Sequence, residues 1–418
     1  MRSSIFGLVA LLFACGTSNP NGNDGGTNDG GNNNDGGNND GSSGGFCSQG
    51  TLYAGNPLFT GDPLSRPTSG TAIKADPPLV WQTLVISGTH LYTRQESEVW
   101  SVDMSAASPV ETKIAGTTPS GSTYDFKAGP CSSASFTQLR GLGAMSDGSL
   151  VAADYWANSI VKISNPDNPG TCTVSVIVGT AGPLTGVDPS DSNTLPPAGN
   201  ANGKGAAGSF NGPQALTIDG SGNIFLVDHR VSDDATLIRR IDPSGFASTL
   251  ATLGTSPGAP TDITNLTNIN GTIYAAARDD INNSYVISID LQGNITTVLG
   301  GGSDKFPPVS SGTDPAVTGI TNDGKNLIVA GDGFVWYLKL DGTLTQIAGT
   351  ENTIDFFTTG YDPLQPHPAM QLELPTAIGS ADEDGTGSFN HIVYDNGALY
   401  YRGFADGSSA FIEKIACP

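Results

Sequence analysis

The sequence predicts an all-β fold in which six four-stranded antiparallel sheets form a closed ring, and three observations lead to this prediction. After residue 50, short runs rich in Val, Ile, Leu, Tyr and Thr recur, each broken by Gly, Asp or Asn, which is the pattern of strands joined by turns. These runs group into six similar units. The last unit lacks a fourth strand, and a matching strand lies at the start of the series. A ring closed in this way is a six-bladed β-propeller.

The clearest unit lies between Gln214 and Gly254, where four strands read QALTIDG, GNIFLVD, TLIRRID and FASTLATLG. The strands of the other units fall in residues 84–116, 140–180, 265–301, 318–350 and 391–415. The sequence TLYAG at residues 51–55 matches TKIAG and TQIAG, the fourth strands of two other units. We therefore expect the N-terminal strand to complete the last blade, which removes a free sheet edge.

Two stretches of the clearest unit, FNGPQALTIDGSGNIFLVD and LIRRIDPSGFASTLATLG, resemble NHL-repeat propellers. The resemblance covers most of residues 51–418 and fades in the first and fourth units. It implies a six-bladed propeller and no particular ligand. Just before this stretch, Gly203, Gly205 and Gly208 have the spacing GxGxxG, but a dinucleotide loop follows a strand and opens a helix. These glycines precede a strand, so we interpret them as leading the chain into a blade.

The first residues, MRSSIFGLVALLFACG, predict export. Arg2 precedes an apolar run at residues 5–13 that is shorter than the ~20 residues needed to cross a bilayer, as in a signal peptide. The sequence LFAC resembles the lipobox of bacterial lipoproteins, which implies removal of residues 1–14, lipidation of Cys15 and, because Gly16 follows, delivery to the outer membrane or cell surface. An ordinary signal peptide followed by an unrelated cysteine is the alternative.

Residues 15–46 then predict a disordered linker, because Asn, Gly, Asp, Ser and Thr make up almost all of this stretch and provide too little apolar surface to fold. A calcium-binding β-roll would need an apolar residue in each turn, and none occurs here. We expect the propeller to occupy residues 47–418.

The net charge of −22 disfavours nucleic acid and an anionic membrane surface as partners. We expect contact with the membrane only through the lipid anchor, and we expect a monomer. Four cysteines follow Cys15, and in an exported protein they predict two disulfides with three possible pairings. Ring closure brings Cys47 beside Cys417, and elimination leaves Cys131 with Cys172.

One face of the ring is expected to carry the binding residues. Long insertions occur at residues 117–135, 181–209, 302–315 and 350–389, each between the fourth strand of one blade and the first of the next. In an antiparallel blade these connections emerge on the same face as the turn between the second and third strands, and we call it the elaborated face. Binding residues concentrate on loops held by a rigid scaffold. The candidates at the ends of second strands are Arg94, Tyr155, Trp156, His229, Arg230, Arg278, Asp279, Asp332 and Arg402.

The first functional hypothesis is a non-catalytic surface module that binds a protein, peptide or glycan at this face without a cofactor. A metal-dependent lactonase or lyase is the alternative, with Asp154, Asp228, Asp279 and Asp332 as candidate ligands. That alternative rests on fold analogy, and for Asp154 and Asp228 we favour a structural role, because Asp at the end of a strand commonly caps the following turn. A structural envelope component is a third hypothesis that the sequence does not separate from the first.

Other chemical motifs are weaker. Asp382, Glu383 and Asp384 could bind calcium or form a solvated acidic loop. The GxSxG spacing in GTSPG, at residues 254–258, lacks the strand and helix of a nucleophile elbow. Four scattered histidines, with no HExxH or CxxC motif, disfavour a histidine-rich metal centre.

Overall fold

The computed structural model describes most of the propeller. The described residues are 47–55, 69–71, 83–106, 110–117, 123–180, 182–254, 259–279, 283–300, 306, 317–331, 333–350, 367–372, 374, 392–405 and 409–417. The signal peptide, Cys15, the linker, Asp332 and residues 382–384 lie outside them. In the described part of the chain, no helix is both long and apolar enough to cross a membrane.

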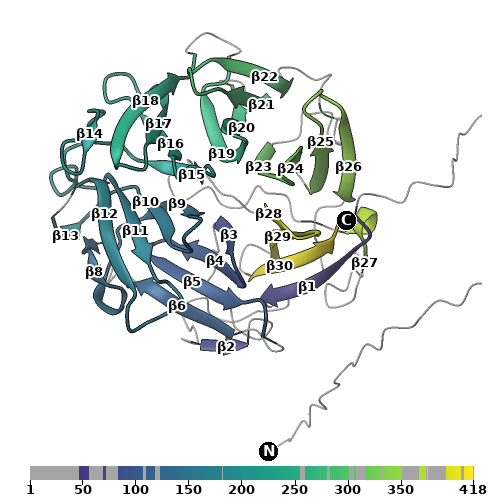
Figure 1. Cartoon of the computed structure of the whole chain (residues 1–418), viewed down its shortest axis with the longest axis horizontal. Helices are drawn as coiled ribbons and strands as arrows, with labels where there is room; N and C mark the ends of the chain where they lie inside the picture. The colour runs from purple at the N-terminus through teal and green to yellow at the C-terminus, as the bar shows by residue number, and fades with distance from the viewer. Residues whose placement is uncertain are drawn as a thin grey trace, which may run out of the picture. The chain divides into compact units, whose positions relative to one another are not determined.

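Six antiparallel blades surround a central channel, which confirms the predicted six-bladed propeller (Figure 1). Their first strands contact one another in a ring that closes from β28 to β3. Blade 1 contains β3 (Thr83–Ser87), β4 (His90–Gln95), β5 (Glu98–Asp103) and β6 (Val110–Gly116), and blade 2 contains β9 (Leu139–Ala144), β10 (Leu150–Asp154), β11 (Ser159–Ser164) and β12 (Thr173–Gly179). Blade 3 contains β15 (Gln214–Ile218), β16 (Ile224–His229), β17 (Thr236–Ile241) and β18 (Phe246–Thr252), and blade 4 contains β19 (Asp262–Ile269), β20 (Thr272–Arg278), β21 (Ser284–Ile289) and β22 (Ile295–Gly300). Blade 5 contains β23 (Val317–Asn322), β24 (Leu327–Gly331), β25 (Phe334–Leu338) and β26 (Leu344–Gly349), and blade 6 contains β28 (Ile392–Asp395), β29 (Ala398–Ala405), β30 (Ser409–Ala416) and β1 (Gln49–Gly55).

The core is divided among the gaps between blades. Each pair of neighbouring blades encloses one cluster of buried apolar side chains. Both faces of a blade are therefore buried, which is why its strands read as apolar runs rather than as alternating patterns. At the gap between blades 2 and 3, a Cβ on Gly143 would lie 2.6 Å from Leu216 Cδ1. Gly143, the second glycine of RGLGAM, thus makes room for the neighbouring blade.

Glycine also ends the fourth strand of four blades in the left-handed region of backbone conformation, at Gly116, Gly179, Gly300 and Gly349. A Cβ at any of them would lie 2.0–2.3 Å from a carbonyl oxygen beside the turn between the second and third strands of the same blade. Only glycine fits such an approach. The recurring glycine of TKIAG and TQIAG therefore fixes the turns that form the elaborated face.

The ring is closed by the two ends of the propeller, as predicted. The N-terminal strand β1 pairs antiparallel with β30, with Gln49 opposite Ala416. A disulfide joins Cys47 to Cys417 across 370 residues of sequence. The second predicted disulfide, between Cys131 and Cys172, is also present.

Three of the insertions and the segment between β1 and β3 add short strands that the sequence analysis missed. Four blades have a fifth, outermost strand, namely β2 (Ser69–Thr71), β8 (Gly129–Pro130), β14 (Gly203–Lys204) and β27 (His367–Pro368). Another pair, β7 (Tyr124–Phe126) and β13 (Leu184–Val187), joins the insertions before and after blade 2. Strands of two to four residues are too short to give a periodic signal. Short 3₁₀ turns η1 (Cys131–Ser133) and η2 (Ala369–Gln371) also lie in the insertions.

Removal of the ring-closing disulfide by Cys47→Ser with Cys417→Ser is expected to lower the free energy of unfolding by about 2–5 kcal/mol. The loss should exceed that of Cys131→Ser with Cys172→Ser, because the loop-entropy estimate is about 6 kcal/mol for the 370-residue separation and about 4 kcal/mol for the 41-residue one. Chemical denaturation of the two double variants measures the order, and the reverse order would contradict the closure role.

Candidate binding face

The candidate residues differ in burial. Arg94, Asp279 and Arg402 are buried, whereas Tyr155, Trp156, His229, Arg230 and Arg278 are half-buried. Asp332 lies outside the described residues. The first group is therefore engaged within the fold, and the second group contains the side chains that reach the surface of the elaborated face.

Asp154 ends β10 and is fully buried. Its carboxylate accepts hydrogen bonds from the backbone N–H of Thr137 at 3.0 Å, of Gln138 at 3.2 Å and of Ala157 at 3.4 Å, and from the Thr137 hydroxyl. These donors belong to the segment leading into blade 2 and to the turn after β10. Asp154 thus fixes an insertion end to a second-strand end, and burial raises its pKa to about 6.

Asp228 has the same role in blade 3, with an ion pair added. Its Oδ2 lies 2.8 Å from Arg239 Nη1, and both side chains are fully buried. Its Oδ1 accepts from the Asn211 N–H at 2.7 Å. Desolvation raises the pKa of Asp228 to about 6 although Arg239 opposes this shift. The carboxylate is ionised at neutral pH and holds the arginine.

Arg239 and Asn200 attach the insertion at residues 181–209 to blade 3. Arg239 donates to the backbone carbonyls of Ser209 at 3.2 Å and Ala201 at 3.1 Å. Asn200 donates to the His229 carbonyl at 2.8 Å and accepts from the Val231 N–H at 2.9 Å. The end of the insertion and the turn after β16 are therefore held as one unit.

Asp279 caps the turn between β20 and β21. It accepts from the Asn283 N–H at 2.8 Å, from Asn283 Nδ2 at 2.7 Å and from the Tyr285 hydroxyl at 3.1 Å. The three described aspartates of the metal hypothesis, Asp154, Asp228 and Asp279, thus have separate partners in blades 2, 3 and 4. Among the described residues, no group of three His, Cys, Asp or Glu side chains could hold a metal ion.

Arg94 also acts within the fold. Its Nη1 donates to the Leu139 carbonyl at the start of β9, and its Nε donates to Thr83 Oγ1 at 3.2 Å. The guanidinium therefore joins the inner strand of blade 1 to that of blade 2. This contact lies at the elaborated end of the channel, where both inner strands begin.

Two aromatic side chains project from the turn after β10. Tyr155 and Trp156 form an edge-to-face pair with ring centroids 4.6 Å apart, and the buried guanidinium of Arg140 lies 3.7 Å from the centre of the Tyr155 ring. Gly212, which leads into blade 3, has φ +69°, and a Cβ there would lie 2.6 Å from the Tyr155 ring. Tyr155 therefore bridges blade 2 and the start of blade 3.

His229 ends β16 and contacts the same leading segment, and Arg230 follows it in the chain. The His229 N–H donates to the Asn211 carbonyl at 3.2 Å, and its Nε2 is 2.7 Å from Gln214 Nε2. Arg230 makes a two-point contact with Asp233, with both N–O distances 2.6 Å. Tyr155 and His229 thus both contact residues 211–214, while Trp156 packs on Tyr155 and Arg230 follows His229 in the chain. We call these four residues the rim patch.

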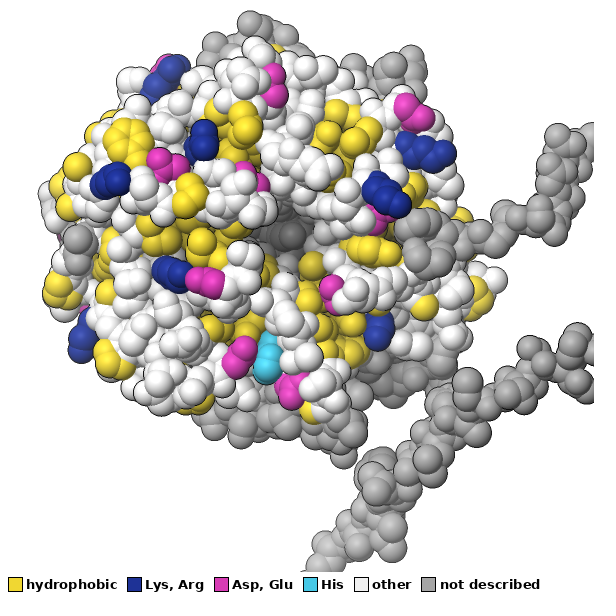
Figure 2. Space-filling view, in the orientation of Figure 1, with side chains coloured by type: hydrophobic (Ala, Val, Ile, Leu, Met, Phe, Trp, Pro, Cys, Tyr) yellow, Lys and Arg dark blue, Asp and Glu magenta, His cyan; other side chains and the backbone are white. Residues whose placement is uncertain are grey.

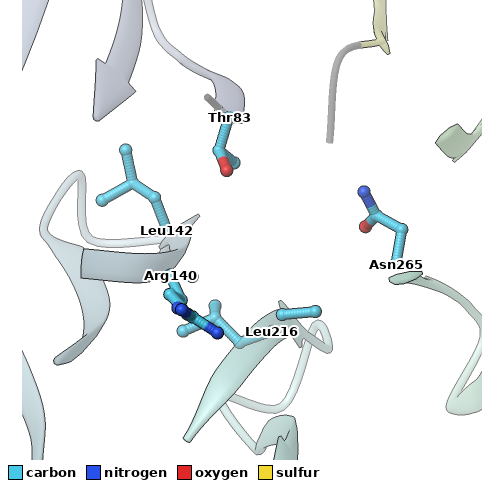
Figure 3. A pocket seen from close by; sticks show the side chains of 7 residues that line it. Thr83, Arg140, Leu142, Leu216 and Asn265 are labelled. Atoms are coloured by element: carbon cyan, nitrogen blue, oxygen red, sulfur yellow. The ribbon is translucent and has the colours of Figure 1, made fainter. Parts of the chain in front are cut away.

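The channel at the centre of the ring contains a small hollow with room for about one water molecule. Figure 2 shows one face of the molecule, hollowed at the centre of the ring, and Figure 3 shows the lining side chains. The hollow is lined by Thr83, Arg140, Gly141, Leu142, Ala215, Leu216 and Asn265, from the inner strands of blades 1 to 4.

Sequence reasoning missed Arg140, Arg239, Asn200 and Asn265. The signal for Arg239 was its place inside the third strand TLIRRI, where a buried charge needs a partner such as Asp228. The polar residues Arg140 and Asn265 lie in first strands, which face the channel. Asn200 had no signal, because its partners are set by the path of the insertion.

The GxGxxG spacing is a packing feature, as predicted. Gly203 belongs to the edge strand β14. A Cβ on Gly208 would lie 2.5 Å from Val178 of blade 2, and Gly205 has φ +53° and accepts from the Gly179 N–H at 3.1 Å. These glycines let the insertion cross closely from blade 2 to blade 3.

No protein-family model and no curated protein matches the chain. Among solved structures, it is similar to a Bacteroides thetaiotaomicron protein of unknown function (14% identity, 89% of this chain and 76% of that chain, TM-score 0.49). It is also similar to a gluconolactonase from Xanthomonas campestris (12%, 81% and 85%, TM-score 0.46) and to virginiamycin B lyase from Staphylococcus aureus (13%, 84% and 98%, TM-score 0.43). With these identities and TM-scores, the similarities carry no argument about activity.

The pKa of Asp154 is higher in the folded protein than in the unfolded chain, so the free energy of unfolding depends on pH through this carboxyl group. The folded carboxyl binds a proton more readily than the unfolded one, so its contribution to stability is lost as pH rises through the range from about 4 to 6. The stability advantage of wild type over Asp154→Asn should therefore fall by about 1.4 kcal/mol between pH 5 and pH 7.5. Urea denaturation at both pH values measures it, and an unchanged advantage would contradict the raised pKa.

Proposed function

We propose that this chain is an exported, lipid-anchored binding module whose rim patch contacts a protein, peptide or glycan partner without catalysis. The observation that supports this function is the contact of Tyr155 and His229 with one short segment at the junction of blades 2 and 3, with Trp156 packed on Tyr155 and Arg230 next to His229. These side chains remain half-buried on a face whose backbone is held by buried Asp154 and Asp228.

The residue types in the rim patch suit partner recognition. Tyr, Trp and Arg are the side chains that most often dominate the binding energy of protein interfaces. The edge-to-face pair and the Arg140 contact hold the aromatic rings before a partner arrives. Such preorganisation lowers the entropy lost on association.

The location is proposed from the N-terminal sequence. The lipobox-like LFAC and the low-complexity linker would attach the propeller to a bilayer while separating it from the lipid surface. The net charge of −22 would keep an anionic surface at a distance. The partner is therefore expected at the cell envelope rather than among nucleic acids.

Replacement of Cys15 tests the anchor. Cys15→Ala should abolish incorporation of a labelled fatty acid and move the protein from the membrane fraction to the soluble fraction, because the acylated sulfur is lost. Retention of label in Cys15→Ala would contradict lipidation at this residue.

Replacement of rim-patch residues tests the binding face. A partner identified by crosslinking on intact cells should be captured at least tenfold less strongly by purified Trp156→Ala, and less strongly by His229→Ala and Arg230→Glu. The matched control is Phe246→Ala, because Phe246 is 41% exposed at the turn between β17 and β18, on the opposite face of blade 3. Capture that survives all three rim changes but is lost in Phe246→Ala would place the interface on the other face.

A further inference from the structure

The outer edges of the blades differ in how they are covered. In blades 1, 2, 3 and 6 a short fifth strand, β2, β8, β14 or β27, pairs antiparallel with the first residues of the outermost strand. In the described part of the chain, no strand pairs with the outer edge of β22 in blade 4, which lies at the periphery of the ring (Figure 1). We propose that this edge, at residues 295–297, binds an extended segment of a partner protein as an added antiparallel strand. The edge is separate from the rim patch, and the proposal does not depend on it.

The lengths of the connections explain why the edge of blade 4 is left open. Each fifth strand belongs to the connection that leads into its own blade from the elaborated face. To pair with the start of the outermost strand and return, such a connection must travel about 40 Å, because a six-residue strand like β22 is about 20 Å long. The connection into blade 4 consists of residues 253–261, which span at most about 30 Å when extended. It therefore cannot supply a fifth strand to β22. Blade 5 is not compared, because residues 301–305 and 307–316 of its connection lie outside the described residues.

Burial at equivalent positions shows the effect of the missing strand. One residue of each outermost strand lies beside the fifth strand and opposite the end of the third strand. In the covered blades these residues are Glu111, Val174, Ala247 and Gly50, which pair with Gly70, Gly129, Gly203 and His367. All four are buried. Ile295 has this position in blade 4, because it lies opposite Ile289 as Ala247 lies opposite Ile241. Ile295 is half-buried, and none of the six residues of β22 is buried.

Blade 3 shows which backbone groups an added strand satisfies. Alternate N–H groups of an antiparallel strand face away from its inner neighbour. In β18, Ala247 pairs with Gly203 of the fifth strand. Two residues later, the Thr249 N–H donates to Asn202 Oδ1 at 3.2 Å. The segment around β14 therefore covers both outward-facing N–H groups at the start of β18.

The equivalent N–H groups of β22 belong to Ile295 and Thr297. No strand or side chain among the described residues accepts a hydrogen bond from them. Natural proteins often protect an open edge with charged side chains or proline, but β22 reads ITTVLG and contains neither. A shift in register follows Thr297, so residues 295–297 form the straight part of the edge. This length equals that of β2, the fifth strand of blade 1.

The fifth strands also indicate the residue types of the partner segment. Three of the four place glycine beside the position equivalent to Ile295, namely Gly70, Gly129 and Gly203. A partner segment with glycine at this point therefore reproduces the pairing that the fold itself uses.

Charge complementarity adds a cation next to that glycine. In blade 3, hydrogen bonds, chiefly from the Ser244 hydroxyl, and the charge of Lys204 lower the pKa of Asp242. Asp290 has the same place in blade 4, where hydrogen bonds from Asn294 lower its pKa and no cation contributes. An extended segment with glycine followed by Lys or Arg would supply that cation.

Hydrogen exchange of the wild-type protein tests whether the edge is open. The Ile295 and Thr297 amides should exchange at least tenfold faster than those of Ala247 and Thr249, which the fifth strand of blade 3 covers. Equal protection in dilute protein would show that another segment of this chain covers the edge. Protection that appears only at high protein concentration would show that a second copy covers it. Either result overturns the proposal.

A synthetic peptide with the sequence of residues 199–207, GNANGKGAA, is the probe for an added strand. In an NMR titration it should shift the Ile295 and Thr297 amide signals to saturation. An N-methyl group on the glycine before the lysine should weaken binding at least tenfold, because this glycine's N–H faces the edge. An N-methyl group on the lysine is the control and should leave binding unchanged, because that N–H faces away. Absence of saturable shifts, or equal binding of the two methylated peptides, overturns the proposal.

Two pairs of variants connect peptide binding to this edge. Asp290→Asn removes the charge that faces the peptide lysine and should weaken binding about two- to fivefold, whereas Asp242→Asn at the equivalent place in blade 3 should have no effect. Thr297→Pro removes one outward N–H at a position where an edge strand tolerates proline, and should weaken binding severalfold. Thr297→Val keeps that N–H and should bind as wild type does. Unchanged binding in both Asp290→Asn and Thr297→Pro overturns the site.

Discussion

A sheet that buries both faces needs a neighbour on each side, and in this protein only a closed ring gives every blade two neighbours. Six apolar clusters lie between the six pairs of blades. The cluster between blades 1 and 6 joins elements far apart in the chain. Pairing of β1 with β30 and the Cys47–Cys417 disulfide hold these ends together. Closure therefore determines the position of every inner strand and of the channel between them.

The polar contacts of the elaborated face depend on that frame. Asp154 and Asp228 lie in the interior at the ends of second strands, where burial of an ionised carboxylate is unfavourable. Backbone N–H groups from the leading segments, and in blade 3 the Arg239 guanidinium, offset this cost. Because each carboxylate has several donors in fixed positions, the irregular connections adopt defined paths. The rim patch and the channel hollow both lie at this end of the propeller.

The sequence was sufficient to predict the blades and their closure, because strand and turn patterns repeat and TLYAG has the spelling of a missing fourth strand. The predicted closure placed Cys47 beside Cys417, and elimination then gave the second disulfide. Side-chain environment was harder to predict. Arg94 and Arg230 both follow second-strand apolar runs, yet Arg94 is buried against blade 2 while Arg230 pairs with Asp233 near solvent. That difference depends on which neighbouring carbonyl or carboxylate is within reach.

The central claim is that buried second-strand aspartates fix the elaborated face before any partner binds. Hydrogen–deuterium exchange of the Thr137 and Asn211 amides tests it most directly, because these N–H groups donate to Asp154 and Asp228 at 3.0 Å and 2.7 Å. Protection comparable to that of the β10 and β16 amides is the expected result. Exchange of Thr137 and Asn211 within seconds, while those strands stay protected, would show that the connections open independently and would contradict the claim.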